Sequence, residues 1–298
     1  MNAPHIALVS ARGARKLDED LPPLRRALEE SGARVTIARW DDPKIAWSDF
    51  DLALLRSTWD YARRLPEFLQ WIERAAACTR LLNPPEVVRW NTDKHYLGVL
   101  ERASVPVVPS AFVEPGQDAQ RALAGILEAH PHAEDIVIKP SVGAGSKDAQ
   151  RHARGSDGEM LAHLDRLLRA NRSALMQPYL PSVDTRGETA LLFFNGEYNH
   201  AIRKGPLLKR GAESARGLFA VEQITAREPS SAEREIAQRA LEAIPFARPL
   251  LYARVDLIHD ESGAPQLLEL ELTEPSVFLA HAAGSAERFA RAILARAR

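Results

Sequence analysis

The sequence of 298 residues predicts an α/β chain with a parallel α/β unit at its start and antiparallel strands at its end. Short apolar runs alternate with amphipathic helical segments over about 1–90, which is typical of a parallel, doubly wound unit. Asn195 and Gly196 separate two apolar segments, and this dipeptide is the strongest sequence signal for a two-residue hairpin turn. A second pair of strand-like segments flanks 260–263 in the same manner.

Three domains are expected: an N-terminal α/β domain at 1–104, a central domain at 105–177 and a C-terminal domain at 178–298. The first should hold strands at 5–10, 33–40 and 51–57 and helices at 21–31, 65–77 and, capped by Asn91 or Thr92, on to about 103. The second should hold strands at 110–113, 136–139 and 174–177 and helices at 118–129 and 157–169. The third should hold hairpins at 189–203 and 250–273 and helices at 231–243 and 285–297.

Composition excludes several classes of protein. The chain has 39 basic and 40 acidic residues, so it lacks the strong positive charge of a general nucleic-acid binder. It also lacks an apolar run of the roughly 18 residues that a membrane helix needs, and its N-terminal apolar stretch is too short for a signal peptide. We therefore expect a cytoplasmic protein without nucleic-acid or membrane partners, and a homodimer stays open. Cys78, the single cysteine, is expected to be a packed core thiol.

A lysine and a loop of small residues form the first candidate site. Lys139 ends an apolar strand and is followed by Ser, Val, Gly, Ala, Gly and Ser at 141–146. Such a loop lets backbone N–H groups approach an anion, and the ammonium adds a point charge. The chain has only seven lysines against 32 arginines, so a lysine in this setting is a candidate for chemistry. A glycine-rich turn beside a lysine stem on apolar surface is the alternative.

A strand that runs into a proline-rich connection forms the second candidate. Backbone groups after Gln177, near Tyr179 and Leu180, could bind a flat base edge, although a plain linker fits equally well. Asp184 and Glu188 follow at a distance that would reach a ribose. Taken singly, these acids are more typical of surface charge.

Acidic side chains on the last predicted hairpin form the third candidate. Alternation places Arg254 and Asp256 on one strand face and Glu269 and Glu271 on one face of the next strand. If the strands pair, three carboxylates converge and require a cation, and oxygen ligands of this kind suit Mg²⁺. A solvated strand face is the alternative.

Taken in order, these segments resemble the ATP-grasp superfamily over about 90–298. The motifs RSTWDY (56–61), NPPEVVRWNTDKHYL (83–97), QPYLPSVDTRGE (177–188) and ELELTEPSVFL (269–279) further resemble a subgroup that includes glutathione-synthetase-like enzymes and the cyclo-ligase of D-cycloserine biosynthesis. The resemblance implies an ATP-grasp fold with a Rossmann-like N-terminal domain, a small central lid domain and a C-terminal antiparallel-sheet domain.

The resemblance also implies roles for individual residues. The ATP phosphates would be held by Lys94, Lys139, Ser141, Gly143, Ala144, Gly145 and Ser146. Adenine would be held by Gln177, Tyr179 and Leu180, and the ribose by Asp184 or Glu188. Mg²⁺, with Mn²⁺ as an alternative, would be held by Asp256, Glu269 and Glu271. Catalysis would use Arg254, Lys204 and Arg203, and Arg56, Ser57 and Ser276 are weaker candidates for substrate contacts. Two positions depart from the family pattern: Glu271, or Thr273 if the frame shifts, stands where Asn is usual, and Gln177 stands where many members have Glu.

The expected activity is that of an ATP- and Mg²⁺-dependent carboxylate–amine ligase acting on small amino-acid-like substrates through an acyl phosphate. Such chemistry needs charge neutralisation and positioning instead of a side-chain nucleophile, and the sequence offers no nucleophile motif. A narrower expectation is cyclisation of an O-ureidoserine-type substrate. A nucleotide-binding protein without ligase activity and a phosphotransferase are the two alternatives.

Overall fold

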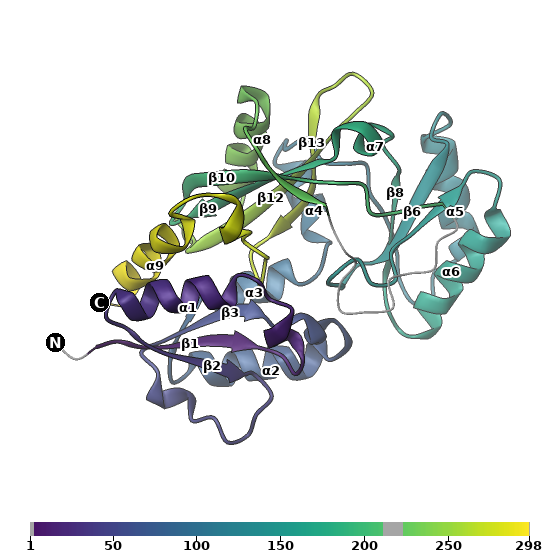
Figure 1. Cartoon of the computed structure of the whole chain (residues 1–298). Coiled ribbons are helices and arrows are strands. Elements are labelled where there is room, and N and C mark those ends of the chain that lie inside the picture. Colours follow the sequence, from purple (N-terminus) through teal and green to yellow (C-terminus); the bar gives the residue numbers. More distant parts are fainter. Residues whose placement is uncertain (1–2, 211–222, 298) are drawn as a thin grey trace.

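The computed structural model describes residues 3–210 and 223–297, and it contains three sheets (Figure 1). The N-terminal sheet is parallel, with strand order β2-β1-β3-β4. Its strands and α-helices are β1 (His5–Ser10), α1 (Leu21–Glu30), β2 (Arg34–Arg39), β3 (Leu52–Ser57), α2 (Leu65–Ala76) and β4 (Arg80–Leu82). This arrangement confirms the predicted parallel α/β unit, to which β4 adds a short strand that the sequence had not indicated.

Alternation along β1 gives the N-terminal sheet two apolar faces. Ile6 and Leu8 pack in one cluster with α1 and with the C-terminal helix α9 (Ser285–Arg296), whereas Ala7 and Val9 pack with α2 on the other side. Helix α9 lies beside α1 although the two are at opposite ends of the chain (Figure 1). Both chain ends therefore stabilise the same domain.

The central domain is a four-stranded antiparallel sheet of order β5-β8-β6-β7 that packs on two helices. Its elements are β5 (Ala111–Val113), α5 (Ala119–Ala129), β6 (Asp135–Pro140), β7 (Gln150–Ala153), α6 (Asp157–Arg169) and β8 (Ala174–Pro178). The Asp118 side chain caps α5 by accepting a hydrogen bond from the Arg121 amide. An apolar core between the sheet and both helices makes this domain a compact unit at one side of the molecule (Figure 1).

The C-terminal sheet is antiparallel, with strand order β11-β10-β9-β12-β13. Its elements are α7 (Ser182–Arg186), β9 (Glu188–Phe194), β10 (Glu197–Lys204), β11 (Ile224–Arg227), α8 (Ser231–Glu242), β12 (Tyr252–His259) and β13 (Pro265–Glu271). Both predicted hairpins are present, and Asn195 and Gly196 have the positive φ angles that a tight hairpin turn requires. The α7 helix and β11 strand had not been predicted.

Two short helices join the N-terminal domain to the C-terminal sheet. They are α3 (Pro85–Asn91) and α4 (Tyr96–Arg102), and they replace the single predicted helix that Asn91 or Thr92 would have capped. The Asn91 side chain instead pairs with the edge of β13, donating to the Leu270 carbonyl and accepting from the Leu272 amide. Tyr96 and Leu97 pack against the same sheet, so these helices anchor Lys94, which lies between them.

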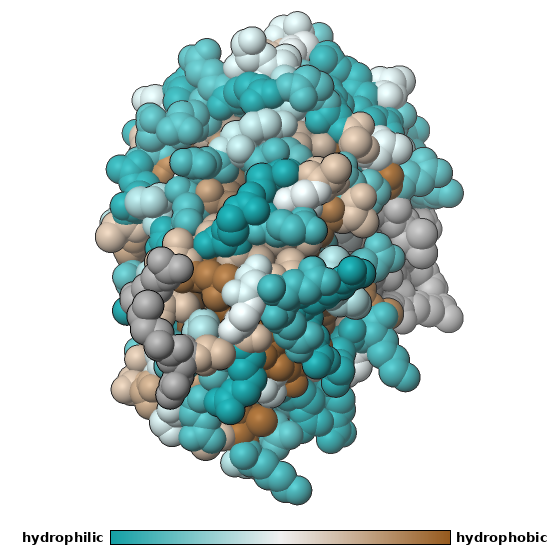
Figure 2. Space-filling view, turned by 60° about the vertical axis from the view of Figure 1, so that its left-hand side comes forward, coloured by the Kyte–Doolittle hydropathy of each residue, from teal (hydrophilic) through white to brown (hydrophobic). Residues whose placement is uncertain are grey.

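One prediction about the core is wrong. Cys78 is exposed, because α2 ends at Ala76 and the thiol follows in the turn beyond the last buried residue of that helix, Ala75. On the face seen in Figure 2, hydrophilic residues predominate and apolar residues lie mostly in recesses between them. Among the described residues, Leu17 is the only exposed large hydrophobic side chain, and no helix is long and apolar enough to cross a membrane.

Candidate active site

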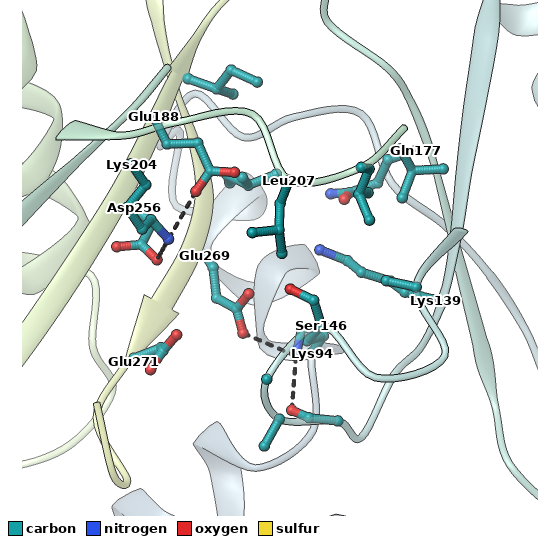
Figure 3. A pocket seen from close by; sticks show the side chains of 18 of the residues that line it. Lys94, Lys139, Ser146, Gln177, Glu188, Lys204, Leu207, Asp256, Glu269 and Glu271 are labelled. Carbon is teal, nitrogen blue, oxygen red and sulfur yellow. Dashed lines mark hydrogen bonds and ion pairs between the residues drawn. The ribbon is translucent and has the colours of Figure 1, made fainter. Parts of the chain in front are cut away.

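A single cavity brings together most of the predicted site residues. It lies between the C-terminal sheet and the central domain (Figure 3), and side chains of the N-terminal domain also line it. Of the predicted residues, its lining includes Lys94, Lys139, Gly143, Ala144, Gly145, Ser146, Gln177, Tyr179, Leu180, Glu188, Lys204, Arg254, Asp256, Glu269, Glu271 and Ser276. Three domains therefore contribute to one site.

Lys139 is the cation of the central domain in this cavity. It lies near the end of β6, and Figure 3 shows its ammonium directed into the cavity, towards the acidic side chains across it. Within residues 3–210 and 223–297, no acidic side chain forms an ion pair with it. Burial lowers the pKa of Lys139, as expected for a cation removed from water without a direct partner. A bound anion would supply the missing countercharge.

The loop that follows Lys139 spans two domains. Ser141 anchors its start, because its carbonyl accepts a hydrogen bond from the Lys94 amide at 3.0 Å. Val142 and Ala144 pack against the N-terminal apolar cluster that contains Trp59. The loop thus covers the cavity between the central and N-terminal domains, and Lys147 at its end also lines the cavity.

Acidic side chains lie on the opposite wall. In the β12–β13 pairing, Asp256 is opposite Glu269 and Arg254 is opposite Glu271, so the predicted shared face exists. Arg254 Nε lies 2.9 Å from Asp256 Oδ1, and Arg254 also forms an ion pair with Glu271. Lys204 adds a second cation, with its Nζ 2.7 Å from Asp256 Oδ2 and 2.8 Å from Glu188 Oε2 (Figure 3).

Burial and these ion pairs act in opposite directions on the carboxyl groups. Burial raises the pKa of Asp256, but Arg254 and Lys204 outweigh it and hold the pKa below its ordinary value. The pKa of Glu269 is also below its ordinary value. Burial raises it, but Lys94, whose Nζ lies 2.9 Å from Glu269 Oε1, lowers it by more. At Glu271 the effect of burial is larger than that of Arg254, and it raises the pKa to about 7. The wall therefore carries its negative charge mainly on Asp256 and Glu269.

The three carboxylates do not form a ready-made metal cluster. Among the described residues, no group of three or more His, Cys, Asp or Glu side chains is arranged to hold a metal ion. The three groups instead form ion pairs with Lys94, Lys204 and Arg254. Two opposed carboxylates still suit Mg²⁺, which typically takes one or two carboxylates and completes its shell with phosphate oxygens and water.

An apolar wall lies beyond Gln177. The small hydrophobic cluster that contains Tyr179 and Leu180 lines the cavity throughout; its other members are Val108, Val137, Val183, Leu208, Ile258 and Leu268. Gln177 donates to Ser110 Oγ at 2.9 Å, so its side chain fixes the start of this wall. The wall fits the flat, apolar faces of a base. Sequence analysis missed most of these residues, which are isolated apolar positions on several strands.

Five predicted residues lie outside the cavity lining. Arg203 extends to the other side of β10 and donates to the carbonyls of Thr185 and Arg186. Asp184 accepts a hydrogen bond from Tyr179 Oη and forms an ion pair with Arg151. Of the two ribose candidates, only Glu188 lines the cavity. The other three are Ser141, Arg56 and Ser57.

Arg56 and Ser57 have a different position from the one predicted. Arg56 is 1% exposed and donates to the Pro275 carbonyl at 2.9 Å, while Ser57 donates to Ser10 Oγ. Ser57 thus joins β3 to β1 within the N-terminal sheet, whereas Arg56 serves the junction between the N-terminal domain and the segment after β13. The same junction places Trp59, Tyr61 and Glu274 in the cavity lining, and sequence analysis had not singled out these three.

Comparison with known proteins identifies the family. The model for the N-terminal domain of D-cycloserine synthetase DcsG matches residues 6–83. Over 295 residues the chain is 39% identical to the cycloserine biosynthesis protein DcsG of Streptomyces lavendulae, and the match covers 98% of each chain. The chain belongs to the DcsG family.

Solved structures agree with this assignment. The crystal structure of D-cycloserine synthetase DcsG matches with a TM-score of 0.92 at 38% identity, covering 99% of this chain and 100% of that one. The ATP-grasp ligase PsnB, solved with its minimal precursor, Mg and ADP, has a TM-score of 0.62 at 17% identity, with 98% of each chain covered, and so shows the fold alone. The expected ATP-grasp fold is confirmed, and this DcsG-family member is an ATP-dependent ligase.

Proposed function

We propose that this ligase joins a carboxylate to a nitrogen of the same small, amino-acid-like molecule, closing the ring of an O-ureidoserine-type substrate at the expense of ATP. The similarity over nearly the whole chain to a cycloserine biosynthesis protein supports the substrate class. The cavity supports the chemistry, because Lys139, with which none of the described acidic side chains forms an ion pair, faces the ion-paired carboxylates Asp256 and Glu269 across a space lined by a glycine-rich loop.

The phosphates of ATP would bind between Lys139, Lys94 and the backbone of 143–146. The base would lie against the apolar wall at Tyr179 and Leu180, and Glu188, which also lines the cavity, would bind the ribose. Asp256 and Glu269, with Glu271 beside them, would hold Mg²⁺, for which Mn²⁺ is an alternative. The metal ion would neutralise charge on the phosphates during transfer.

The reaction would proceed in two steps. The substrate carboxylate attacks the γ-phosphate, so that an acyl phosphate forms and ADP is released. A nitrogen of the same molecule then attacks the acyl carbon, loses a proton, and inorganic phosphate leaves as the ring closes. Arg254 would stabilise negative charge on the transferring phosphoryl group and on the acyl oxygen. The loop over the cavity would exclude water from the acyl phosphate.

The test is to incubate the enzyme with ATP, Mg²⁺ and O-ureidoserine and to measure ADP and phosphate together with the mass of the product. We expect stoichiometric ADP, phosphate and a cyclic product. Hydroxylamine added during turnover should yield a hydroxamate from the acyl phosphate. ADP release with a stable phosphate ester, and no hydroxamate, would indicate a phosphotransferase and contradict the proposal. A product without a new ring would exclude cyclisation.

A further inference from the structure

Glu274 is a buried carboxyl group at the end of the cavity that the N-terminal domain closes. It follows β13, is 7% exposed and belongs to the cavity lining together with Tyr61 and Trp59. Tyr61 also acts on this carboxyl group, because its phenol lowers the pKa of Glu274 against the larger effect of burial. Trp59 Nε1 donates to the Glu274 carbonyl at 3.3 Å. The N-terminal domain therefore holds the backbone of Glu274 and contributes a polar neighbour of its side chain.

The next residue is fixed as well. Arg56 donates to the Pro275 carbonyl at 2.9 Å, and its own ion pair with Asp20 is at 3.6 Å. Contacts between two domains thus fix the backbone at Glu274. A carboxylate that only faced solvent would not require such contacts. Such restraint is typical of a side chain that must present its charge in one direction.

Charge balance separates Glu274 from the other acids of the cavity. Asp256, Glu188, Glu269 and Glu271 each form an ion pair with a lysine or arginine of the chain. Over the described ranges, 3–210 and 223–297, no cation lies within ion-pair distance of Glu274. Burial accordingly raises the pKa of Glu274 to about 8. The group lacks a cation that a ligand can supply.

The position of Glu274 limits which ligand cation this can be. Arg254 Nη1 donates to the carbonyl of Ser276 at 3.1 Å, so the segment 274–276 borders the guanidinium that serves the reacting carboxylate. In an α-amino acid the ammonium and the carboxylate are attached to one carbon atom. A carboxyl group beside the carboxylate site is therefore within reach of the ammonium.

We propose that Glu274, positioned by Tyr61, binds the protonated α-amino group of the substrate and so selects amino acids over other carboxylic acids. This inference rests on the proposed function for the identity of the substrate. Glu274 is the binding residue, and Tyr61 acts through it.

The experiment compares two acids that differ only in the amino group, O-ureidoserine and 3-(ureidooxy)propanoic acid, by steady-state ADP release at saturating ATP. In the wild type the amino acid should have a KM at least about tenfold lower, since a hydrogen bond to a charged group is worth this much. Glu274→Gln should raise the KM for O-ureidoserine at least about tenfold, with little change in kcat or in the KM for the analogue. Glu261→Gln, in the exposed turn after β12, is the control and should keep the wild-type preference.

Tyr61→Phe provides a second variant that keeps the ring. It should lose part of the same preference, through KM and not kcat, and it carries the test if Glu274→Gln does not fold. A Glu274→Gln enzyme that keeps the wild-type preference, or that loses activity equally with both acids, would overturn the role of Glu274.

Failure of the proposed function can be told apart from this result. If the wild type turns over neither acid, the ring-closing function is wrong. Calorimetric binding of serine and 3-hydroxypropanoate in the presence of ADP and Mg²⁺ then decides the role of Glu274. A preference for serine that Glu274→Gln abolishes supports it, and no preference, or one that the variant keeps, overturns it.

Discussion

Lys94 Nζ lies 2.9 Å from Glu269 Oε1, and this ion pair joins the connection between the first two domains to the edge strand of the third. Lys94 also donates to the Gly143 carbonyl of the glycine-rich loop at 3.5 Å. One cation therefore touches both the acidic wall and the loop that covers the cavity. Nucleotide and metal would bind between the acidic wall and this loop. The contacts of Lys94 therefore set the distance between the wall and the loop.

Glu269→Gln should weaken the use of Mg²⁺ without changing the shape of the side chain. The substitution removes a carboxylate proposed as a metal ligand and leaves Lys94 without its partner. We expect the Mg²⁺ concentration for half-maximal ADP release to rise at least about tenfold, since even outer partners of metal ligands cost this much. Glu261→Gln should respond to Mg²⁺ as the wild type does. An unchanged Mg²⁺ dependence of Glu269→Gln would remove Glu269 from the proposed site.

Lys139→Met should weaken ATP binding without lowering the stability of the protein. Burying a cation is unfavourable when no acidic side chain pairs with it, as holds for Lys139 among the residues that the structure describes, so the variant should unfold at the same or a higher temperature than the wild type. Its KM for ATP should rise at least about tenfold because the triphosphate loses a charge-assisted partner. Lys44→Met, which removes an exposed lysine, is the control for net charge. A variant with wild-type KM for ATP would contradict the assignment.

The same lysine predicts a pH dependence. Burial lowers the pKa of Lys139 from the ordinary 10.5, and only its protonated form attracts phosphate. ATP binding should therefore weaken as pH rises through this lowered pKa, before free lysines begin to titrate. Measuring the KM for ATP against pH in the wild type and Lys139→Met checks this, because the variant should lack that part of the profile.

Regular strands made much of the site predictable. Alternation along β13 was enough to place Glu269 and Glu271 on one face, and the apolar run before Lys139 was enough to place it near a strand end. The N-terminal sheet followed from its alternating elements for the same reason. These patterns are local, so a single sequence contains them.

Contacts between distant segments were not predictable. Tyr61 lies in a short 3-10 helix and Glu274 in an irregular segment, and neither has a periodicity that indicates a direction. Both line the same cavity, where Arg56 and Trp59 bind the backbone carbonyls of Pro275 and Glu274. Likewise, nothing in the sequence of the α2 turn showed that Cys78 faces solvent.

The prediction that Arg203 and Lys204 both serve the site could have been corrected from the sequence alone. Adjacent strand residues point to opposite faces, so the two cannot both serve one cavity. Lys204→Ala should lower kcat about 100-fold, since the ammonium that balances Asp256 and Glu188 is lost. Arg203→Ala removes the same charge but should keep kcat within about threefold and cost about 1 kcal/mol of stability for its lost hydrogen bonds. Equal losses of kcat in the two variants would contradict the geometry.

Gly187 connects α7 to β9, next to Glu188, and its φ of +70° lies in the region that favours glycine. A Cβ atom at this position would lie 2.3 Å from the carbonyl oxygen of Lys204. The end of β10, which carries Lys204, would therefore have to shift. Gly187→Ala should therefore combine backbone strain with displacement of the Lys204 ammonium from its partners.

Gly32→Ala is the matched control, because Gly32 has a φ of +88° but nothing within 4 Å of a Cβ atom. Backbone strain alone should cost Gly32→Ala about 1 kcal/mol, and the added clash should bring Gly187→Ala to about 3 kcal/mol or more. Chemical denaturation of both variants measures this difference, and ADP release measures its effect on the site. Gly187→Ala should lose kcat while Gly32→Ala keeps it. Equal destabilisation with equal activity would show that the end of β10 adjusts without cost, and that the position of Lys204 does not depend on Gly187.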